Sequence, residues 1–169
     1  MSGEELKARA RKVRLILMDV DGVLTDGRIW YVPRGTDWEE VKTFDVADGA
    51  GIVLAHRNGL KTGIVSGRAA RVIDHRAAEL GIEDVHLGVR DKGRVVGELI
   101  SDHGLEEDQV AFIGDEIVDL PAFQRVGFPV AVANATDDVK RNATYVTEAS
   151  GERGTVREVI ELILKSQDK

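Results

Sequence analysis

The segment VRLILMDVDGVLTDG occupies residues 13–27 and decides where the first strand of the fold ends. Its first six residues, Val13–Met18, are mostly aliphatic and too few for a helix, so we predict a buried strand. In an extended backbone, residues i and i+2 point the same way, so Asp19 and Asp21 face one site just beyond that strand. Two carboxylates that face one site repel each other unless a cation or a shared proton relieves them. The pair therefore suits a nucleophile and an acid–base group beside a metal. The alternative is a solvated turn.

Short aliphatic runs alternate with helical stretches along the rest of the chain. Further strands are predicted at Lys61–Val65, Asp84–Leu87, Val110–Ile113, Phe128–Val132 and Thr144–Thr147. Helices are predicted from about Gly51 to Gly59 and at Ala69–Leu80, Gly93–His103, Ile117–Val126 and Thr155–Ser166, with a short polar one at the N-terminus. This alternation predicts an α/β fold, a doubly wound parallel sheet with helices on both faces. A ligand site is then expected beyond the carboxyl ends of the strands.

One segment interrupts the alternation. Residues Arg28–Val32 and Trp38–Phe44 are short and strand-like, and Pro33–Asp37 between them has the composition of a hairpin turn. This hairpin, residues 28–44, is too small to be a domain and is predicted to be a flap beside the first strand. With 169 residues, the chain is predicted to form a single domain, residues 1–169, without a large cap domain.

Two further motifs follow predicted strands. GDEIVD, residues 114–119, carries Asp115 and Asp119 four residues apart and so on one helical face. The alternative is that Asp115 only caps the helix. SGR, residues 66–68, combines the Ser66 hydroxyl with the free amides of Gly67 and its neighbours, which can cradle an anion at a helix N-terminus. The alternative is an ordinary N-cap serine.

A lysine completes the set of candidate groups. Lys92 follows Asp91 between a predicted strand and a helix, where a cation is unfavourable to the helix dipole. The alternative is an exposed surface lysine. Together, the motifs supply carboxylates, a hydroxyl, amides and a cation at the carboxyl ends of parallel strands. That combination predicts Mg²⁺-assisted phosphoryl transfer, since Mg²⁺ prefers hard oxygen ligands.

Composition excludes several classes of function. The formal net charge is −7, which argues against a nucleic-acid or acidic-membrane surface, since both require a basic field. The chain has no cysteine, so it has no disulfide or thiolate metal site. No apolar run approaches the roughly 18 residues that span a bilayer, and the N-terminus lacks a signal-peptide pattern. A cytoplasmic enzyme is therefore expected.

The order of the motifs DVDGVLTDG, VSGR, DK and GDEIVD resembles the haloacid dehalogenase superfamily of phosphatases. Within it, the chain from about Val13 to Leu164 is similar to the 3-deoxy-D-manno-octulosonate 8-phosphate phosphatases. The segments FDVADGAGI, VGFPVAVANA and GERGTVREV match that subfamily in place, as does the hairpin. The resemblance implies a Rossmann-like core, Mg²⁺ as cofactor, a sugar acid phosphate as substrate and a part in lipopolysaccharide biosynthesis. It also implies a homotetramer in which hairpins cover neighbouring sites.

The resemblance further implies a role for each motif residue. Asp19 is expected to be the nucleophile and a metal ligand, and Asp21 the acid–base group with its backbone carbonyl on the metal. Asp115 is the third protein ligand. Ser66 and Lys92 bind the phosphoryl group, while Glu116 and Asp119 support the metal and Lys92. Three residues depart from the subfamily pattern, namely Glu116 for aspartate, Ala47 for arginine and Glu152 for glycine.

A sugar acid phosphate needs a second set of cations for its carboxylate. If a helix begins near Arg68, the three-residue spacing places Arg68 and Arg71 on one side of it, and arginine suits bidentate carboxylate recognition. Arg153 and Arg157 of the C-terminal segment are expected to close over the sugar. Three alternatives stay open: a phosphatase for a nine-carbon, sialic-acid-type phosphate, a receiver-like phosphoacceptor domain and a non-catalytic module.

Overall fold

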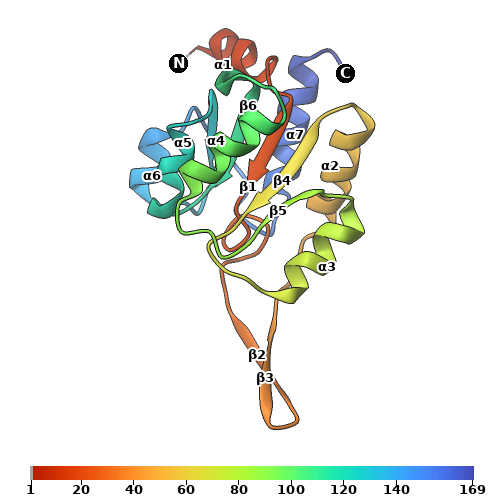
Figure 1. Cartoon of the computed structure of the whole chain (residues 1–169). Helices are drawn as coiled ribbons and strands as arrows, with labels where there is room; N and C mark the ends of the chain where they lie inside the picture. Colours follow the sequence, from red (N-terminus) through yellow and green to blue (C-terminus); the bar gives the residue numbers. More distant parts are fainter. Residues whose placement is uncertain (1) are drawn as a thin grey trace.

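The computed structural model describes residues 2–169, in which six parallel strands form one sheet in the order β5-β4-β1-β6-β7-β8 (Figure 1). The strands are β1 (Leu15–Met18), β4 (Lys61–Val65), β5 (Asp84–His86), β6 (Val110–Gly114), β7 (Phe128–Ala131) and β8 (Tyr145–Val146). All residues of β1, β6 and β7 are buried, as expected for strands covered on both faces. The predicted doubly wound fold is confirmed.

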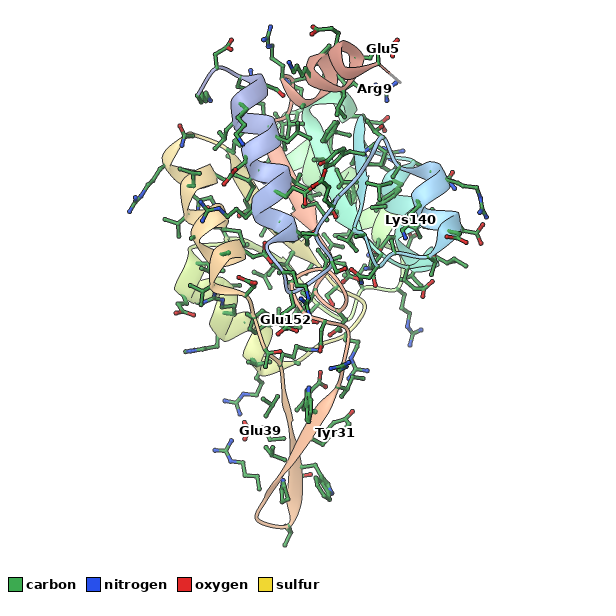
Figure 2. All side chains as sticks on the ribbon, turned by 180° about the vertical axis from the view of Figure 1, so that it is seen from behind. Glu5, Arg9, Tyr31, Glu39, Lys140 and Glu152 are labelled. Carbon is green, nitrogen blue, oxygen red and sulfur yellow. The ribbon has the colours of Figure 1, made fainter. Side chains whose placement is uncertain are left out.

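Helices cover both faces of this sheet. They are α1 (Gly3–Ala10), α2 (Val46–Arg57), α3 (Arg71–Leu80), α4 (Lys92–Asp102), α5 (Leu120–Phe123), α6 (Asp137–Asn142) and α7 (Thr155–Ser166). Two short 3₁₀ helices, η1 (Glu107–Gln109) and η2 (Ile117–Asp119), precede β6 and α5. Helices α2 and α7 pack together on one face, and α4 and α5 lie on the other (Figures 1 and 2). Within residues 2–169, no helix combines the length and the apolar character needed to cross a membrane.

The flap is a two-stranded antiparallel ribbon, β2 (Trp30–Arg34) and β3 (Asp37–Val41), that extends away from the sheet (Figure 1). Its turn is shorter than predicted. Pro33 and Arg34 lie in β2, and Gly35, with φ +63°, provides the left-handed residue of a tight turn. Proline is tolerated in this strand because each strand of a ribbon has an edge that needs no ladder hydrogen bond.

Two predicted helices differ from the observed ones. Helix α2 begins at Val46, five residues earlier than predicted, with Asp45 as its cap. The glycines inside this helix weaken its sequence pattern, so its start was not predicted. Glycine is required at position 51 by close packing, since a Cβ there would lie 2.9 Å from Arg157 Cα of α7. The helix predicted at Ile117–Val126 is instead the 3₁₀ turn η2 followed by the single turn α5.

Candidate active site

Three adjacent strands bring the predicted motifs to one edge of the sheet. Strand β1 pairs with β4 on one side and with β6 on the other, and the chain leaves them at Asp19, Ser66 and Asp115. Lys92 opens α4 and joins the same group. The structure thus gathers the carboxylates, the hydroxyl and the lysine that lie far apart in the sequence.

Lys92 lies at the centre of the cluster. Its Nζ is 2.8 Å from Asp19 Oδ2 and donates to Asp119 Oδ1 at 2.6 Å, and its side chain is almost fully buried. Burial lowers the pKa of Lys92, but the charges of Asp19 and Asp119 outweigh burial and raise the pKa above its ordinary value. Lys92 therefore carries a positive charge beside Asp19, as the binding of a phosphoryl group requires.

The carboxylates around Lys92 fit a hard divalent cation. Asp19, Asp115 and Asp119 each offer an oxygen within 4.8 Å of the others. Burial, together with the neighbouring carboxylates, raises the pKa of Asp19 to about 6 and that of Asp115 to about 7. Asp115 Oδ1 is buried without a hydrogen-bond partner. A divalent cation that prefers oxygen ligands would bind this oxygen and relieve the repulsion between the neighbouring carboxylates.

Asp119 differs from the other two carboxylates because both of its oxygens are engaged. Oδ1 accepts from Lys92, and Oδ2 accepts from the amides of Asp115 at 2.9 Å and Glu116 at 3.2 Å. Asp119 therefore holds Lys92 and the 115–116 turn in place, which suits the predicted supporting role. Glu116 is exposed, and its Oε1 accepts from the amide of Ile117 at 2.7 Å, so it caps the turn; its predicted support of the metal stays a prediction.

Asp21 lies among charged groups that come from the flap and from the segment after β4. Its Oδ1 pairs with Lys42 Nζ, and its Oδ2 lies 3.6 Å from Arg68 Nε. Glu40 of β3 joins both cations, at 2.7 Å from Lys42 and 2.8 Å from Arg68. Lys42 and Glu40 were not predicted from the sequence, because a single lysine and a single glutamate at the end of a strand form no recognisable motif.

The anion cradle is only partly as predicted. Ser66 is buried at the end of β4, and its Oγ accepts from the amide of Arg68 at 3.3 Å, while Gly67 is exposed. Helix α3 begins at Arg71, so Arg68 lies in the turn before it and the argument from helical spacing is wrong. Arg71 is exposed and lines a cleft of about 850 Å³ between the flap and α3.

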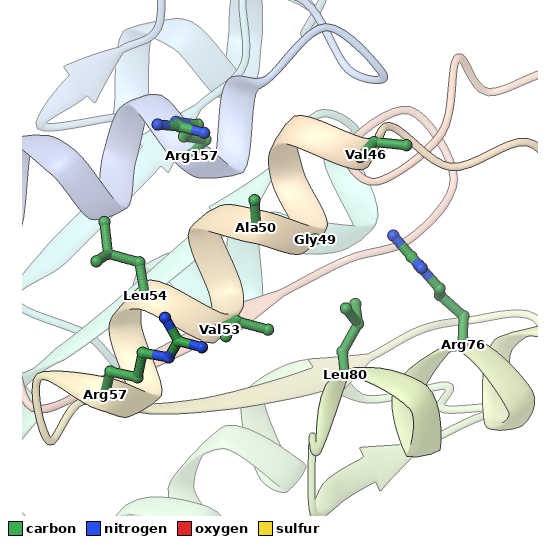
Figure 3. A pocket seen from close by; sticks show the side chains of 9 residues that line it. All are labelled: Val46, Gly49, Ala50, Val53, Leu54, Arg57, Arg76, Leu80 and Arg157. Carbon is green, nitrogen blue, oxygen red and sulfur yellow. The ribbon is translucent and has the colours of Figure 1, made fainter.

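The two C-terminal arginines are separated by the structure. Arg153 lines a cleft of about 430 Å³ with Asp26, Arg28 and Glu152 beside the loop that follows β1. Arg157 lines a different groove, between α2, α3 and α7, and its Nε donates to Glu161 at 2.8 Å (Figure 3). The expectation that Arg157 closes over the sugar is therefore corrected.

The C-terminal segment is fastened to the loop after β1. Asn134 donates to the carbonyl of Gly22 at 3.1 Å and accepts from the amide of Gly151 at 2.7 Å. A Cβ on Gly151 would lie 2.0 Å from the Gly22 oxygen, so only glycine permits this approach. Glu152 adopts a left-handed φ of +61°, which glycine takes without strain. Asn134 escaped sequence reasoning because its role depends on the tertiary contact.

A family model described as haloacid dehalogenase-like hydrolase matches residues 85–160. The 3-deoxy-D-manno-octulosonate 8-phosphate phosphatase of Yersinia pestis is 41% identical over 166 residues, which are 98% of this chain and 87% of that protein. The chain belongs to the 3-deoxy-D-manno-octulosonate 8-phosphate phosphatase family.

Solved structures of this phosphatase family share the fold closely. The enzyme of Moraxella catarrhalis, in complex with a magnesium ion, a phosphate ion and a 3-deoxy-D-manno-octulosonate molecule, superposes with a TM-score of 0.94 at 38% identity. That comparison covers 99% of this chain and 94% of the other. The cobalt-bound form of the enzyme of Haemophilus influenzae superposes with a TM-score of 0.89 at 36% identity, covering 95% and 92% of the two chains.

Proposed function

We propose that this phosphatase hydrolyses 3-deoxy-D-manno-octulosonate 8-phosphate with Mg²⁺ as cofactor, through a phosphoryl group carried transiently on Asp19. The observation that carries the proposal is the buried cluster at the carboxyl end of β1. There, Asp19 lies against a charged Lys92, and Asp115 has a buried oxygen without a partner. A nucleophile, a phosphoryl-binding cation and ligands for a hard metal thus meet within one site.

The reaction divides into two steps. In the first, a carboxylate oxygen of Asp19 attacks phosphorus while Asp21 gives a proton to the departing sugar oxygen. In the second, Asp21 takes a proton from water, which hydrolyses the acyl phosphate and releases Asp19 and inorganic phosphate. Lys92, Ser66 and backbone amides bind the phosphoryl oxygens throughout.

Asp19, Asp115 and the backbone carbonyl of Asp21 would hold the Mg²⁺ ion. When bound, it neutralises charge on the phosphoryl oxygens. Asp119 keeps Lys92 directed at the same site through its 2.6 Å hydrogen bond.

The sugar acid itself is proposed from the names of the relatives and from the local charge. The relative from Moraxella catarrhalis holds the eight-carbon sugar acid together with phosphate and magnesium. In this chain, Arg68 lies beside Asp21, Arg71 lines the cleft between the flap and α3, and Arg153 lines the cleft beside the loop after β1, so these arginines are the candidate cations for a carboxylate. A cytoplasmic location belongs to the proposal, because a sugar phosphate is too highly charged to cross a bilayer unaided.

Phosphate release from a panel of esters tests the proposed function. The panel includes the eight-carbon keto acid phosphate, a nine-carbon sialic-acid-type phosphate and a hexose phosphate without a carboxylate, each with and without Mg²⁺. We expect the highest kcat/KM for the eight-carbon substrate and loss of activity on all of them after chelation. Preference for the nine-carbon substrate would reassign the sugar acid, and activity that persists without any divalent ion would contradict the metal-assisted mechanism.

We further propose that the chain assembles into a homotetramer in which flaps cover neighbouring sites. The flap exposes Trp30, Tyr31 and Trp38 by 55%, 56% and 66%, a concentration of aromatic surface that favours burial against a partner (Figure 2 labels Tyr31). An isolated two-stranded ribbon is also marginally stable by itself. Packing against neighbouring copies supplies both the missing contacts and a cover for the site.

Light scattering of the intact protein is expected to give about four times the mass of one chain. Replacing Tyr31–Glu39 by a short turn is expected to reduce both the mass and the turnover, because the site then lies open to water. This deletion retains Glu40 and Lys42, so the contacts of Lys42 with Asp21 and with Glu40 are preserved. A fully active monomer, either intact or shortened, would contradict the shared-lid arrangement.

A further inference from the structure

Among residues 2–169, two lysines are buried, and each lies against one carboxylate of the DVD motif. Lys92 contacts Asp19, and Lys42 contacts Asp21. The first pair belongs to the phosphoryl-binding site described above. In the second pair, Asp21 is the proposed acid–base group, but Lys42 has no part in the proposed mechanism, although its side chain has no exposed surface.

Lys42 belongs to a closed ring of alternating charges. Around the ring, Asp21 contacts Lys42, Lys42 contacts Glu40 at 2.7 Å, and Glu40 contacts Arg68 at 2.8 Å. Arg68 completes it, with Nε 3.6 Å from Asp21 Oδ2. The side chains of Asp21 and Glu40 are 21% and 16% exposed and that of Arg68 is 43% exposed, so the ring is shielded at Lys42 and open to solvent at Arg68.

A buried lysine is costly unless its charge is compensated, and such an ion pair seldom adds net stability over apolar packing. The presence of Lys42 is therefore explained better by a role in positioning Asp21 than by a contribution to stability. The two oxygens of Asp21 have different partners, since Oδ1 accepts a hydrogen bond from Lys42, whereas the buried Oδ2 accepts none and has only the longer 3.6 Å contact with Arg68 Nε. Lys42 therefore fixes the rotation of the carboxyl group and leaves Oδ2 without a hydrogen bond.

The position of Lys42 in the chain links this geometry to the flap. Lys42 directly follows β3, whose Glu40 is its second partner. Any movement of β3 relative to the sheet changes where the Lys42 ammonium lies. The orientation of Asp21 is thus set by the flap of the same subunit, in addition to any cover that a neighbouring flap provides.

We propose that Lys42 is a positioning residue that orients the Asp21 carboxyl group so that Oδ2, which accepts no hydrogen bond, meets the leaving oxygen of the substrate. This inference rests on the proposed function, in which Asp21 protonates the leaving group. It assigns to the flap a direct effect on proton transfer.

The test compares two substrates with different leaving groups. A sugar phosphate needs its leaving oxygen protonated, whereas 4-nitrophenyl phosphate scarcely does. Lys42→Met is expected to lower kcat for the sugar phosphate by about 10- to 100-fold, part of the roughly 10²- to 10⁴-fold effect of a general acid. Its kcat for the aryl phosphate is expected to change by less than about threefold. Lys42→Arg, which keeps the charge, is expected to recover part of the loss.

Control variants separate the possible causes. Asp21→Asn is the reference and is expected to show the same selectivity more strongly. Lys12→Met, which removes an exposed lysine paired with Asp108 at 2.9 Å, is expected to leave both rates unchanged. Equal loss of both rates in Lys42→Met would show a general structural role and overturn the inference, and so would unchanged rates on both substrates.

A second variant keeps the test decisive if Lys42→Met does not fold. Glu40→Gln retains the side-chain shape but removes the charge that ties Lys42 to β3, and it is expected to show the same selective loss on a smaller scale. Unchanged selectivity in folded Glu40→Gln would overturn the link to the flap. Failure of the proposed function is recognised separately, because Asp21→Asn would then lose its own dependence on the leaving group.

Discussion

Asp19→Asn is expected to lose about 10⁴-fold or more in kcat, the scale on which removal of a catalytic nucleophile is felt. The amide cannot attack phosphorus, and it withdraws one negative ligand from the proposed metal site. The loss applies equally to sugar and aryl phosphates, because both require the same attacking oxygen. This uniform effect distinguishes Asp19 from Asp21 and Lys42, whose variants are expected to discriminate between leaving groups.

The fold of Asp19→Asn is expected to survive. Lys92 retains Asp119 at 2.6 Å as its partner, so no cation is left buried and unpaired. Burial raises the pKa of Asp19 to about 6, so above that pH the folded protein bears the cost of a buried charge that the neutral amide avoids. Unfolding by urea at pH 7 without Mg²⁺ should therefore show no loss of stability.

Single-turnover phosphate release and the unfolding midpoint are the measurements for this variant. Asp108→Asn, an exposed surface carboxylate paired with Lys12, is the control and is expected to behave as the wild type. Turnover of Asp19→Asn near the wild-type rate would place the nucleophile elsewhere.

Gly22→Ala is expected to disable the site by displacing Asp115. A Cβ at Gly22 would lie 2.0 Å from Asp115 Oδ2, and the backbone there has a φ of +85°, which L-residues adopt at a cost of about 1–2 kcal/mol. Asp115 must therefore leave its present position in the cluster. A displacement of about 1 Å in a catalytic group can cost about 10²-fold in rate. We expect a loss of that order and a higher Mg²⁺ concentration for half-maximal activity.

Gly27→Ala is the matched control in the same loop. Gly27 has a similar φ of +78°, but a Cβ there would meet its nearest neighbour, Gly22 Cα, at an ordinary 3.5 Å. Gly27→Ala therefore measures the backbone strain without the clash. It is expected to unfold at a lower urea concentration while its Mg²⁺ requirement stays unchanged. An equal Mg²⁺ response in the two variants would show that the Asp115 contact does not decide metal binding.

The prediction of the fold from sequence succeeded where a local pattern matched its environment. Strands β1, β6 and β7 are short, mostly apolar runs and are fully buried, and β4 is buried from Thr62 to Val65. Helix α2 was predicted five residues too late because Gly49 and Gly51 weaken its pattern. Those glycines serve packing instead, since added Cβ atoms would meet Arg76 of α3 and Arg157 of α7.

In the candidate site too, some features could be predicted from local sequence patterns and others could not. The DVD, SGR, DK and GDEIVD motifs follow strands or open helices, and parallel topology then brings them to one edge of the sheet. Their convergence could be predicted because every parallel strand ends at that edge. The sequence could not predict which carboxylate oxygens lack a hydrogen bond, because this depends on whether Asp119 or Asp115 accepts the hydrogen bonds that are available.

The chain by itself therefore determined the α/β class and the positions of the candidate carboxylates and of Lys92, because local composition and spacing encode strand ends. Only the tertiary structure decided the neighbours of Asp21. Lys42 lies 21 residues away along the chain, and Asn134 ties the C-terminal segment to Gly22 across 112 residues. These two contacts depend on where the tertiary fold places the flap and the last loop relative to the loop after β1. No local sequence pattern encodes this placement, because Lys42 and Asn134 gain their contacts only from partners that are distant in the sequence.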